Sequence, residues 1–253
     1  MKQNANREIP LIFEDNHLLV VEKPVNIPTQ EDRTGDPDML TLLKADLKQR
    51  HHKPGNVFLG LIHRLDRPVG GVMAFAKTSK AASRLSDDVR TRNFAKSYLA
   101  VVRGTSVQSS GKLVHYLQKH PDSNTVSVVA KSAAGAKQAV LEYEVLGQEE
   151  GLSLLRIELH TGRPHQIRVQ LSAIGCPLYG DQKYGAEVNR PGQQIALWSF
   201  RVALRHPTRQ ERMTFISAPP EQYPWLLWHD IIAEAARSAD NSISASDGDK
   251  NTR

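Results

Sequence analysis

Short apolar runs recur along the chain, and polar or glycine-containing segments separate them. Many of the runs are rich in β-branched residues, a composition that predicts β-strands. The first two runs flank the turn-forming pair Asp15-Asn16, within residues 11–22. The other expected strands cover residues 57–62, 71–76, 98–102, 125–130, 139–146, 153–159, 196–204 and 211–217.

Three stretches carry apolar residues at intervals of three and four instead, which is the spacing of an amphipathic helix. These stretches cover residues 39–50, 80–93 and 165–174. The last one stops at Gly175, a residue type that commonly caps the C-terminal end of a helix. Arg168 is therefore expected to lie on a helix.

Many strands with a few helices between them predict an α+β fold, built on a mixed, mostly antiparallel sheet with flanking helices and loops. We expect the three strands between residues 125 and 159 to form an antiparallel meander. Residues 1–8 are expected to be a flexible N-terminus, and residues 9–230 a single domain. Residues 231–253 turn to Ser, Asp, Asn and Gly, and we expect a disordered tail there.

The composition is that of a soluble globular protein. The chain has 253 residues, of which 40% are hydrophobic, enough for a substantial core. Cys176 is the only cysteine, which rules out an internal disulfide and cysteine-rich zinc modules and fits a reducing cytoplasm. No apolar run approaches the ~18 residues of a membrane span, and residues 1–7 lack the apolar stretch of a secretory signal. We expect a cytoplasmic monomer without a membrane partner.

The chain is basic, with a formal net charge of +6 and a pI near 9.4. Such a surface attracts polyanions, of which nucleic acid is the commonest. The excess of positive charge is concentrated in residues 77–103, where lysines and arginines far outnumber the two aspartates. Clustering favours a binding surface for a polyanion, with a membrane surface as the second candidate after nucleic acid, over charge that serves only solubility. Arg90, Arg92 and Lys96 are the candidate contacts in this segment.

Two motifs that lie far apart in the sequence carry candidate chemistry. Residues 63–71 read His-Arg-Leu-Asp-Arg-Pro-Val-Gly-Gly and set Asp66 between two arginines, so its carboxylate should stay ionised. That setting suits a nucleophilic aspartate. Residues 160–168 read His-Thr-Gly-Arg-Pro-His-Gln-Ile-Arg, and their spacing can place Arg168 against Asp66 in the fold. A purely structural ion pair is the alternative.

Four segments, in the same order, resemble the motifs of the RluA-type pseudouridine synthases. They are Lys23-Pro24, residues 63–71, residues 96–100 (Lys-Ser-Tyr-Leu-Ala) and residues 163–171. Two positions depart from the family pattern, because Val69-Gly70 replaces the usual Thr-Ser and Gln170 stands where a histidine is common. The resemblance implies a pseudouridine-synthase-like catalytic domain that needs no cofactor.

The resemblance also implies roles for individual residues. Asp66 would be the catalytic nucleophile, Tyr98 would stack on the target uracil, and Arg168 would pair with the Asp66 carboxylate. Arg64 would occupy the space that the uridine leaves in the RNA. Further RNA contacts are expected from Arg67, Arg90, Arg92, Lys96, Arg163 and His165. A core position for Tyr98 and a packed, hydrogen-bonded state for His165 are the alternatives.

The histidines do not predict a metal site. His63, His160 and His165 lack the i, i+4 helical spacing of zincin-type sites, and no cysteine cluster supports them. We therefore expect no metal. Gly180-Asp181 and Tyr184-Gly185 predict a turn after the last motif, and Asp181 is assigned no catalytic role.

The predicted function is the isomerisation of specific uridines to pseudouridine in structured rRNA or tRNA. The target base must be flipped into a pocket, because a stacked nucleotide is out of reach. One alternative is an RNA-binding or ribosome-assembly protein that has the fold without turnover, a hypothesis prompted by Val69-Gly70. Another is a glycoside or nucleoside hydrolase, which would need a second carboxylate, and no acid lies near Asp66 in the sequence.

Overall fold

The computed structural model describes residues 9–104 and 108–244, so the predicted flexible N-terminus (1–8) and the end of the predicted tail (245–253) lie outside the described residues. The helices are α1 (Met39–Arg50), α2 (Ser79–Arg90), α3 (Gln166–Ala173), the 3-10 turn η1 (Trp225–Trp228) and α4 (His229–Ser244). The strands are β1 (Leu11–Glu14), β2 (Leu18–Lys23), β3 (Gly60–Leu61), β4 (Gly70–Ala76), β5 (Ala95–Arg103), β6 (Ser110–His120), β7 (Thr125–Val129), β8 (Lys137–Glu149), β9 (Leu152–Leu159), β10 (Leu197–Arg205) and β11 (Arg212–Ile216).

One eleven-stranded sheet runs through the molecule in the order β1-β2-β4-β10-β5-β9-β8-β6-β7, with β3 beside β4 and β11 beside β10. Within the described chain, the strand pairs are antiparallel except for β4 with β10, which run parallel where Gly70 and Gly71 meet Trp198 and Ser199. This arrangement confirms the predicted α+β fold with a mixed, mostly antiparallel sheet. Because β10 alone separates β4 from β5, the segment before β4 comes close to Tyr98.

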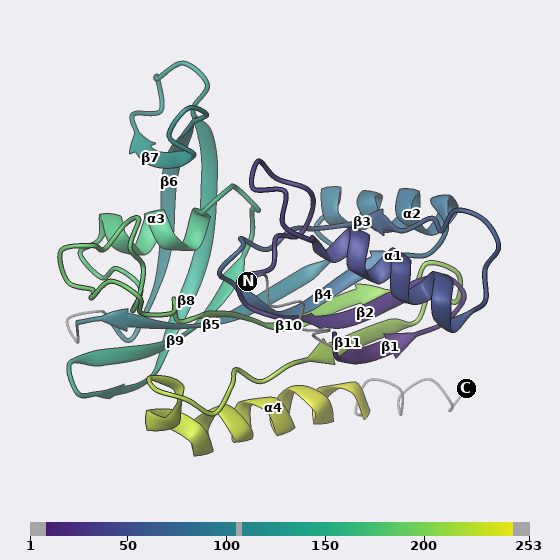
Figure 1. The fold of residues 1–253 in the computed structure, drawn as a ribbon. Coiled ribbons are helices and arrows are strands. Elements are labelled where there is room, and N and C mark those ends of the chain that lie inside the picture. The colour runs from purple at the N-terminus through teal and green to yellow at the C-terminus, as the bar shows by residue number, and fades with distance from the viewer. Residues whose placement is uncertain (1–8, 105–107, 245–253) are drawn as a thin grey trace.

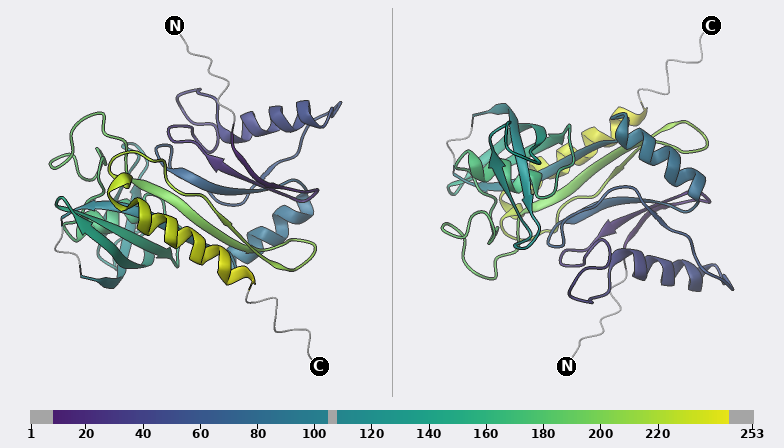
Figure 2. Two further views of the ribbon diagram at one scale, coloured as in Figure 1. Left: turned by 90° about the horizontal axis from the view of Figure 1, so that it is seen from below. Right: turned by 90° about the horizontal axis from the view of Figure 1, so that it is seen from above.

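Helices cover both faces of the sheet, as the two views of Figure 2 show. Successive residues of a strand point to opposite faces, so β2 contributes to two apolar layers. Leu19 and Val21 pack in the same core as α1, whereas Leu18 and Val20 pack in the core of α2. The core of α1 also contains Tyr98 and residues of α3, and η1 and α4 cover the opposite face.

The strand β6 is the main element that the sequence does not predict. Its burial alternates only weakly, and most of its residues are exposed or half-buried, so the period-2 pattern of a half-buried strand is faint. β6 pairs with both β7 and β8, which makes the predicted meander wrong at this step because β8 does not follow β7 in the sheet. The β6–β7 hairpin projects beyond the rest of the sheet (Figure 1).

The predicted disordered tail is wrong for its first part, because α4 runs from His229 to Ser244. Ile231, Ile232 and Ala235 pack against the same core as Trp225 and Trp228. This short apolar stripe lies next to a strongly polar segment. The composition of that polar segment led to the prediction of disorder, although the stripe favours a helix. In the part of the chain that the structure describes, no helix has the length and apolar character needed to cross a membrane.

Candidate active site

A cleft of about 1410 Å³ opens beside the loop that joins β3 to β4. Its walls are residues 28–32, residues 61–69, the start of β5, residues 158–168 and two residues of the β6–β7 hairpin. Every residue that the sequence assigns to catalysis or RNA binding lines this cleft: Arg64, Asp66, Arg67, Arg90, Arg92, Lys96, Tyr98, Arg163, His165 and Arg168. Segments that are far apart in the sequence thus meet at one concave site.

Asp66 lies in the loop between β3 and β4, and a buried lysine holds this loop in place. Lys23 is fully buried, and its Nζ donates to the carbonyl oxygens of Pro24 (3.0 Å), Arg67 (3.0 Å) and Val69 (2.7 Å). Burial lowers the pKa of Lys23 to about 7, and the charge of Asp66 opposes this shift. Three acceptors around one amine fix the backbone just after Asp66.

The two glycines that follow the loop allow β4 to approach β10 closely. Gly71 has a φ of +111°, and a Cβ there would lie 2.2 Å from the carbonyl oxygen of Ser199. A Cβ on Gly70 would lie 2.3 Å from the ring of Trp198. The glycine at position 70, one half of the departure from the Thr-Ser pattern, therefore has a local explanation, because Trp198 occupies the space that a side chain there would need.

Arg168 joins two carboxylates at the floor of the cleft. Its Nη1 lies 3.3 Å from Oδ2 of Asp66, so the predicted contact is confirmed. Its Nε and Nη2 each lie 2.8 Å from a different oxygen of Asp181, which is a bidentate pair. The Asp181 side chain is fully buried, whereas the Asp66 side chain is 28% exposed. Asp181 therefore aims the guanidinium, and Asp66 alone of the two faces the cleft.

The electrostatics of Asp181 fit this positioning role. Burial would raise the pKa of Asp181, but hydrogen bonds and charge from Arg168, together with two backbone N–H groups, lower it. This partner could not be predicted from the sequence, because Asp181 has the surroundings of an ordinary turn aspartate. Its carboxylate is occupied and buried, so it does not supply the second free acid that a glycoside hydrolase would need.

Tyr98 lies on β5, and it is both a core residue and a residue of the cleft. It is only 5% exposed and belongs to the core that contains α1 and α3, yet it also lines the cleft. Burial raises the pKa of the Tyr98 phenol, and the charge of Asp66 adds to this shift. The side chain is therefore a neutral, rigid ring beside Asp66.

The predicted RNA-binding residues differ in whether their side chains already form ion pairs with carboxylates. Arg67 forms ion pairs with Asp32 and Asp36, and Arg90 pairs with Asp87 at 2.6 Å. Within the described residues, no carboxylate forms an ion pair with the other arginines and the lysine of the set, which are Arg64, Arg92, Lys96 and Arg163. Arg163 donates to the carbonyl oxygen of Gln138 instead, at 3.0 Å. Burial lowers the pKa of Lys96.

The three histidines of the motifs have separate environments. His63 is buried, its Nε2 accepts a hydrogen bond from the Ala74 N–H (3.1 Å), and burial, together with Lys96, lowers its pKa to about 3. Nε2 of His160 lies 3.2 Å from Oε2 of Glu142. His165 lies with its Nε2 4.0 Å from Oδ2 of Asp66. No group of three or more potential metal ligands occurs among the residues described by the structure.

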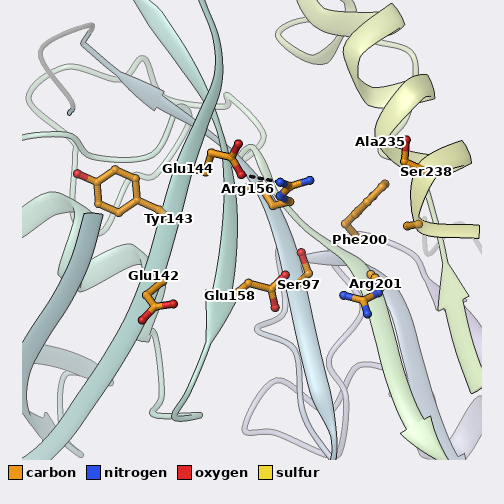
Figure 3. Close-up of a pocket in the computed structure, with 11 residues that line it drawn as sticks. Ser97, Glu142, Tyr143, Glu144, Arg156, Glu158, Phe200, Arg201, Ala235 and Ser238 are labelled. Atoms are coloured by element: carbon orange, nitrogen blue, oxygen red, sulfur yellow. Dashed lines mark hydrogen bonds and ion pairs between the residues drawn. The ribbon is translucent and has the colours of Figure 1, made fainter. Parts of the chain in front are cut away.

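A second hollow, of about 500 Å³, lies between α4 and the strands β5, β8, β9 and β10 (Figure 3). Ser97 lines this hollow and Tyr98 lines the cleft, and neighbouring strand residues point to opposite faces. The hollow therefore lies on the face of the sheet away from Asp66. Its charged residues are three glutamates and two arginines, Glu142, Glu144, Glu158, Arg156 and Arg201, and Glu144 pairs with Arg156 at 2.5 Å. The hollow therefore lacks the excess of positive charge that the cleft offers to RNA phosphates.

Comparisons with known proteins agree with the geometry of the cleft. A family model described as RNA pseudouridylate synthase matches residues 17–173. An uncharacterized RNA pseudouridine synthase of Aquifex aeolicus is 32% identical over 241 residues, covering 88% of this chain and 75% of the relative. The ribosomal large subunit pseudouridine synthase D of Pseudomonas aeruginosa is 34% identical over 239 residues, covering 87% and 71%.

A solved structure shares the fold. Human RNA pseudouridylate synthase domain containing 4 superimposes with a TM-score of 0.71 at 22% identity, covering 90% of this chain and 93% of that one. Together with the cleft, these matches define an RNA-modifying isomerase. The chain belongs to the RNA pseudouridylate synthase family, and it acts on RNA as a pseudouridine synthase.

Proposed function

We propose that this enzyme isomerises specific uridines in structured RNA, with Asp66 as the nucleophile and the target base flipped into the cleft. The observation that carries the proposal is the partly exposed Asp66 carboxylate, held by Arg168 at 3.3 Å inside a basic cleft. Ribosomal RNA is the first candidate substrate, because relatives from three bacteria bear the name ribosomal large subunit pseudouridine synthase D. Transfer RNA is the second.

The reaction needs one carboxylate and no net addition of atoms. The bond between ribose C1′ and uracil N1 breaks, the uracil turns, and C1′ joins C5. The hydrogen leaves C5, and N1 gains a proton, so the product is an isomer of the substrate. A carboxylate can assist as a nucleophile in the first part and as a base for the C5 hydrogen in the second.

Arg168 and Tyr98 would prepare the cleft for this chemistry. Desolvation by a bound nucleotide would disfavour the charged form of Asp66, and the guanidinium of Arg168 opposes that effect. The ring of Tyr98 offers a surface on which the extruded uracil can stack, an interaction worth about 1–3 kcal/mol. Stacking of this size offsets part of the cost of taking the base out of the RNA.

The basic residues of the cleft would hold the RNA backbone. Arg64, Arg92, Lys96 and Arg163 are available for phosphates, whereas Arg67 and Arg90 would exchange their carboxylate partners for phosphate. Arg64, which lines the cleft, would fill the space that the flipped uridine leaves in the RNA. The active form in this proposal is a monomer.

Mapping pseudouridine in cellular RNA tests the substrate and the nucleophile together. RNA from cells that lack the gene should have lost one or a few pseudouridines in large-subunit rRNA, and the wild-type gene should restore them. Asp66→Asn should not restore them. Losses confined to tRNA would reject the rRNA assignment, and restoration by Asp66→Asn would remove Asp66 from the nucleophile role.

A further inference from the structure

Tyr184 lies just outside the residues assigned above and contacts the cleft through His165. Its Oη lies 2.9 Å from the backbone nitrogen of Val126 on β7 and 2.6 Å from Nδ1 of His165. The other ring nitrogen of His165, Nε2, lies 4.0 Å from Oδ2 of Asp66. The imidazole thus bridges the space between the Tyr184 hydroxyl and the predicted nucleophile.

The number of hydrogens available to these contacts favours one tautomer of His165. The Val126 N–H can only donate, so the Tyr184 oxygen accepts there. The hydroxyl has one hydrogen, and within the described residues Nδ1 of His165 is the acceptor it can reach. If Nδ1 carried a hydrogen instead, the hydroxyl hydrogen would have no acceptor within the described residues and would have to turn to solvent. The 2.6 Å contact is satisfied within the protein when Nδ1 accepts, and the neutral ring then carries its hydrogen on Nε2.

The free Nε2–H faces the cleft. At 4.0 Å from Asp66 it is beyond hydrogen-bond distance, so Asp66 does not consume this donor. Burial lowers the pKa of His165, which favours the neutral ring. His165 also has a left-handed backbone with a φ of 51°, a strained conformation of the kind that clusters at functional sites. His165 takes this conformation immediately before α3, and its side chain lines the cleft.

We propose that Tyr184 is a positioning residue that holds His165 with its Nε2–H directed at an oxygen of the nucleotide bound beside Asp66. This inference rests on the proposed function for the nucleotide, but the tautomer belongs to the free protein. The link from Val126 through Tyr184 to His165 also connects the β6–β7 hairpin to the reaction centre, so hairpin placement and donor orientation depend on each other.

Ring-nitrogen NMR of the ¹⁵N-labelled protein tests the tautomer directly. The His165 signal is the one that disappears in His165→Gln. In the wild-type protein at neutral pH, Nε2 should be protonated and Nδ1 should not. In Tyr184→Phe, which keeps the ring over Arg168 (5.2 Å from guanidinium carbon to ring centre), both tautomers should be populated. Tyr223→Phe, an exposed tyrosine whose hydroxyl donates to Glu150, should leave the His165 signal unchanged.

Single-turnover kinetics test the consequence for catalysis. Loss of one oriented hydrogen bond predicts a rate about tenfold lower in Tyr184→Phe, with RNA affinity unchanged and with Tyr223→Phe at the wild-type rate. A protonated Nδ1 in the wild-type protein, or a Tyr184→Phe variant with wild-type tautomer and rate, would overturn the proposal. A wild-type protein with the expected tautomer and no isomerisation of any RNA would overturn the proposed function instead.

Discussion

Asp66 depends on three side chains that come from two parts of the chain, both distant from it in sequence. Lys23 fixes the backbone after Asp66, Arg168 neutralises its carboxylate, and Asp181 aims Arg168. The first two were visible in the sequence as motif residues, whereas Asp181 was not, because a buried bidentate partner has no local pattern. At the scale of single residues, the chemistry-bearing groups can thus be predicted more readily than the groups that orient them.

Replacing Asp181 with Asn should separate orientation from catalysis. The change leaves the buried guanidinium with one carboxylate, and breaking a buried ion pair of this kind costs about 3–5 kcal/mol of unfolding free energy. Turnover should fall because Arg168 no longer presents Nη1 to Asp66. Denaturant unfolding and turnover at saturating RNA measure the two effects. Asp46→Asn, whose partner Arg50 lies outside the cleft, is the control, and wild-type turnover in Asp181→Asn would contradict this role.

Replacing Lys23 with Met should release the loop that carries Asp66. Three carbonyl oxygens lose their common donor, and each unsatisfied buried group costs about 1–3 kcal/mol. We expect a large loss of unfolding free energy and a lower turnover, both compared with Lys48→Met on the exposed side of α1. Urea unfolding checks the first effect. A Lys23→Met protein as stable as Lys48→Met would show that the three hydrogen bonds do not hold the loop.

The buried His63 predicts a pH dependence of stability. Its pKa is about 3 in the folded protein and near 6.5 in the unfolded chain, so between these values the unfolded chain binds more protons. Stability therefore falls as the pH drops through this window, with a slope of up to about 1.4 kcal/mol per pH unit from this group. Unfolding free energies at several pH values should show a flatter slope in His63→Gln. An unchanged slope there, with His52→Gln as the exposed control, would contradict the assignment.

At the scale of elements, the sequence predicts segments with a clear apolar period. The prediction of α1 over residues 39–50 is confirmed, and so are the strands on either side of Asp15-Asn16. The failures are β6 and α4. β6 is stabilised by pairing with β7 and β8, and α4 by packing against η1 and the sheet, so their order comes from tertiary contacts that local periodicity does not encode.

The basic segment around α2 carries a prediction at this scale. Neutralising Arg90, Arg92 and Lys96 together to Gln should weaken RNA binding and flatten its dependence on salt, because fewer counterions are released from the phosphates. Binding measured over a range of salt concentrations gives both quantities. The matched control is Lys44, Lys48 and Lys53 to Gln, an equal charge change on and after α1 and outside the cleft. Equal effects of the two triple variants would reject the cleft as the RNA-binding surface.

At the scale of the whole molecule, the fold class and the composition of the cleft could be predicted, but its shape could not. The motifs indicate which residues carry charge or aromatic rings, and the sheet order then brings them together through the parallel pair of β4 with β10. The His165–Tyr184 contact and the link to the β6–β7 hairpin depend on side-chain geometry after folding. Such contacts have no signature in the spacing of residues along the chain.

The central claim is that the Asp66 carboxylate performs the isomerisation, and release of tritium from RNA that contains 5-tritiated uridine measures this most directly. The label leaves as water when C5 joins C1′, so release counts completed reactions. The wild-type protein and Asp46→Asn, which changes a partner of Arg50 outside the cleft, should release tritium at equal rates. Asp66→Asn should bind the same RNA and release none above background. Release by Asp66→Asn at the wild-type rate would contradict the account.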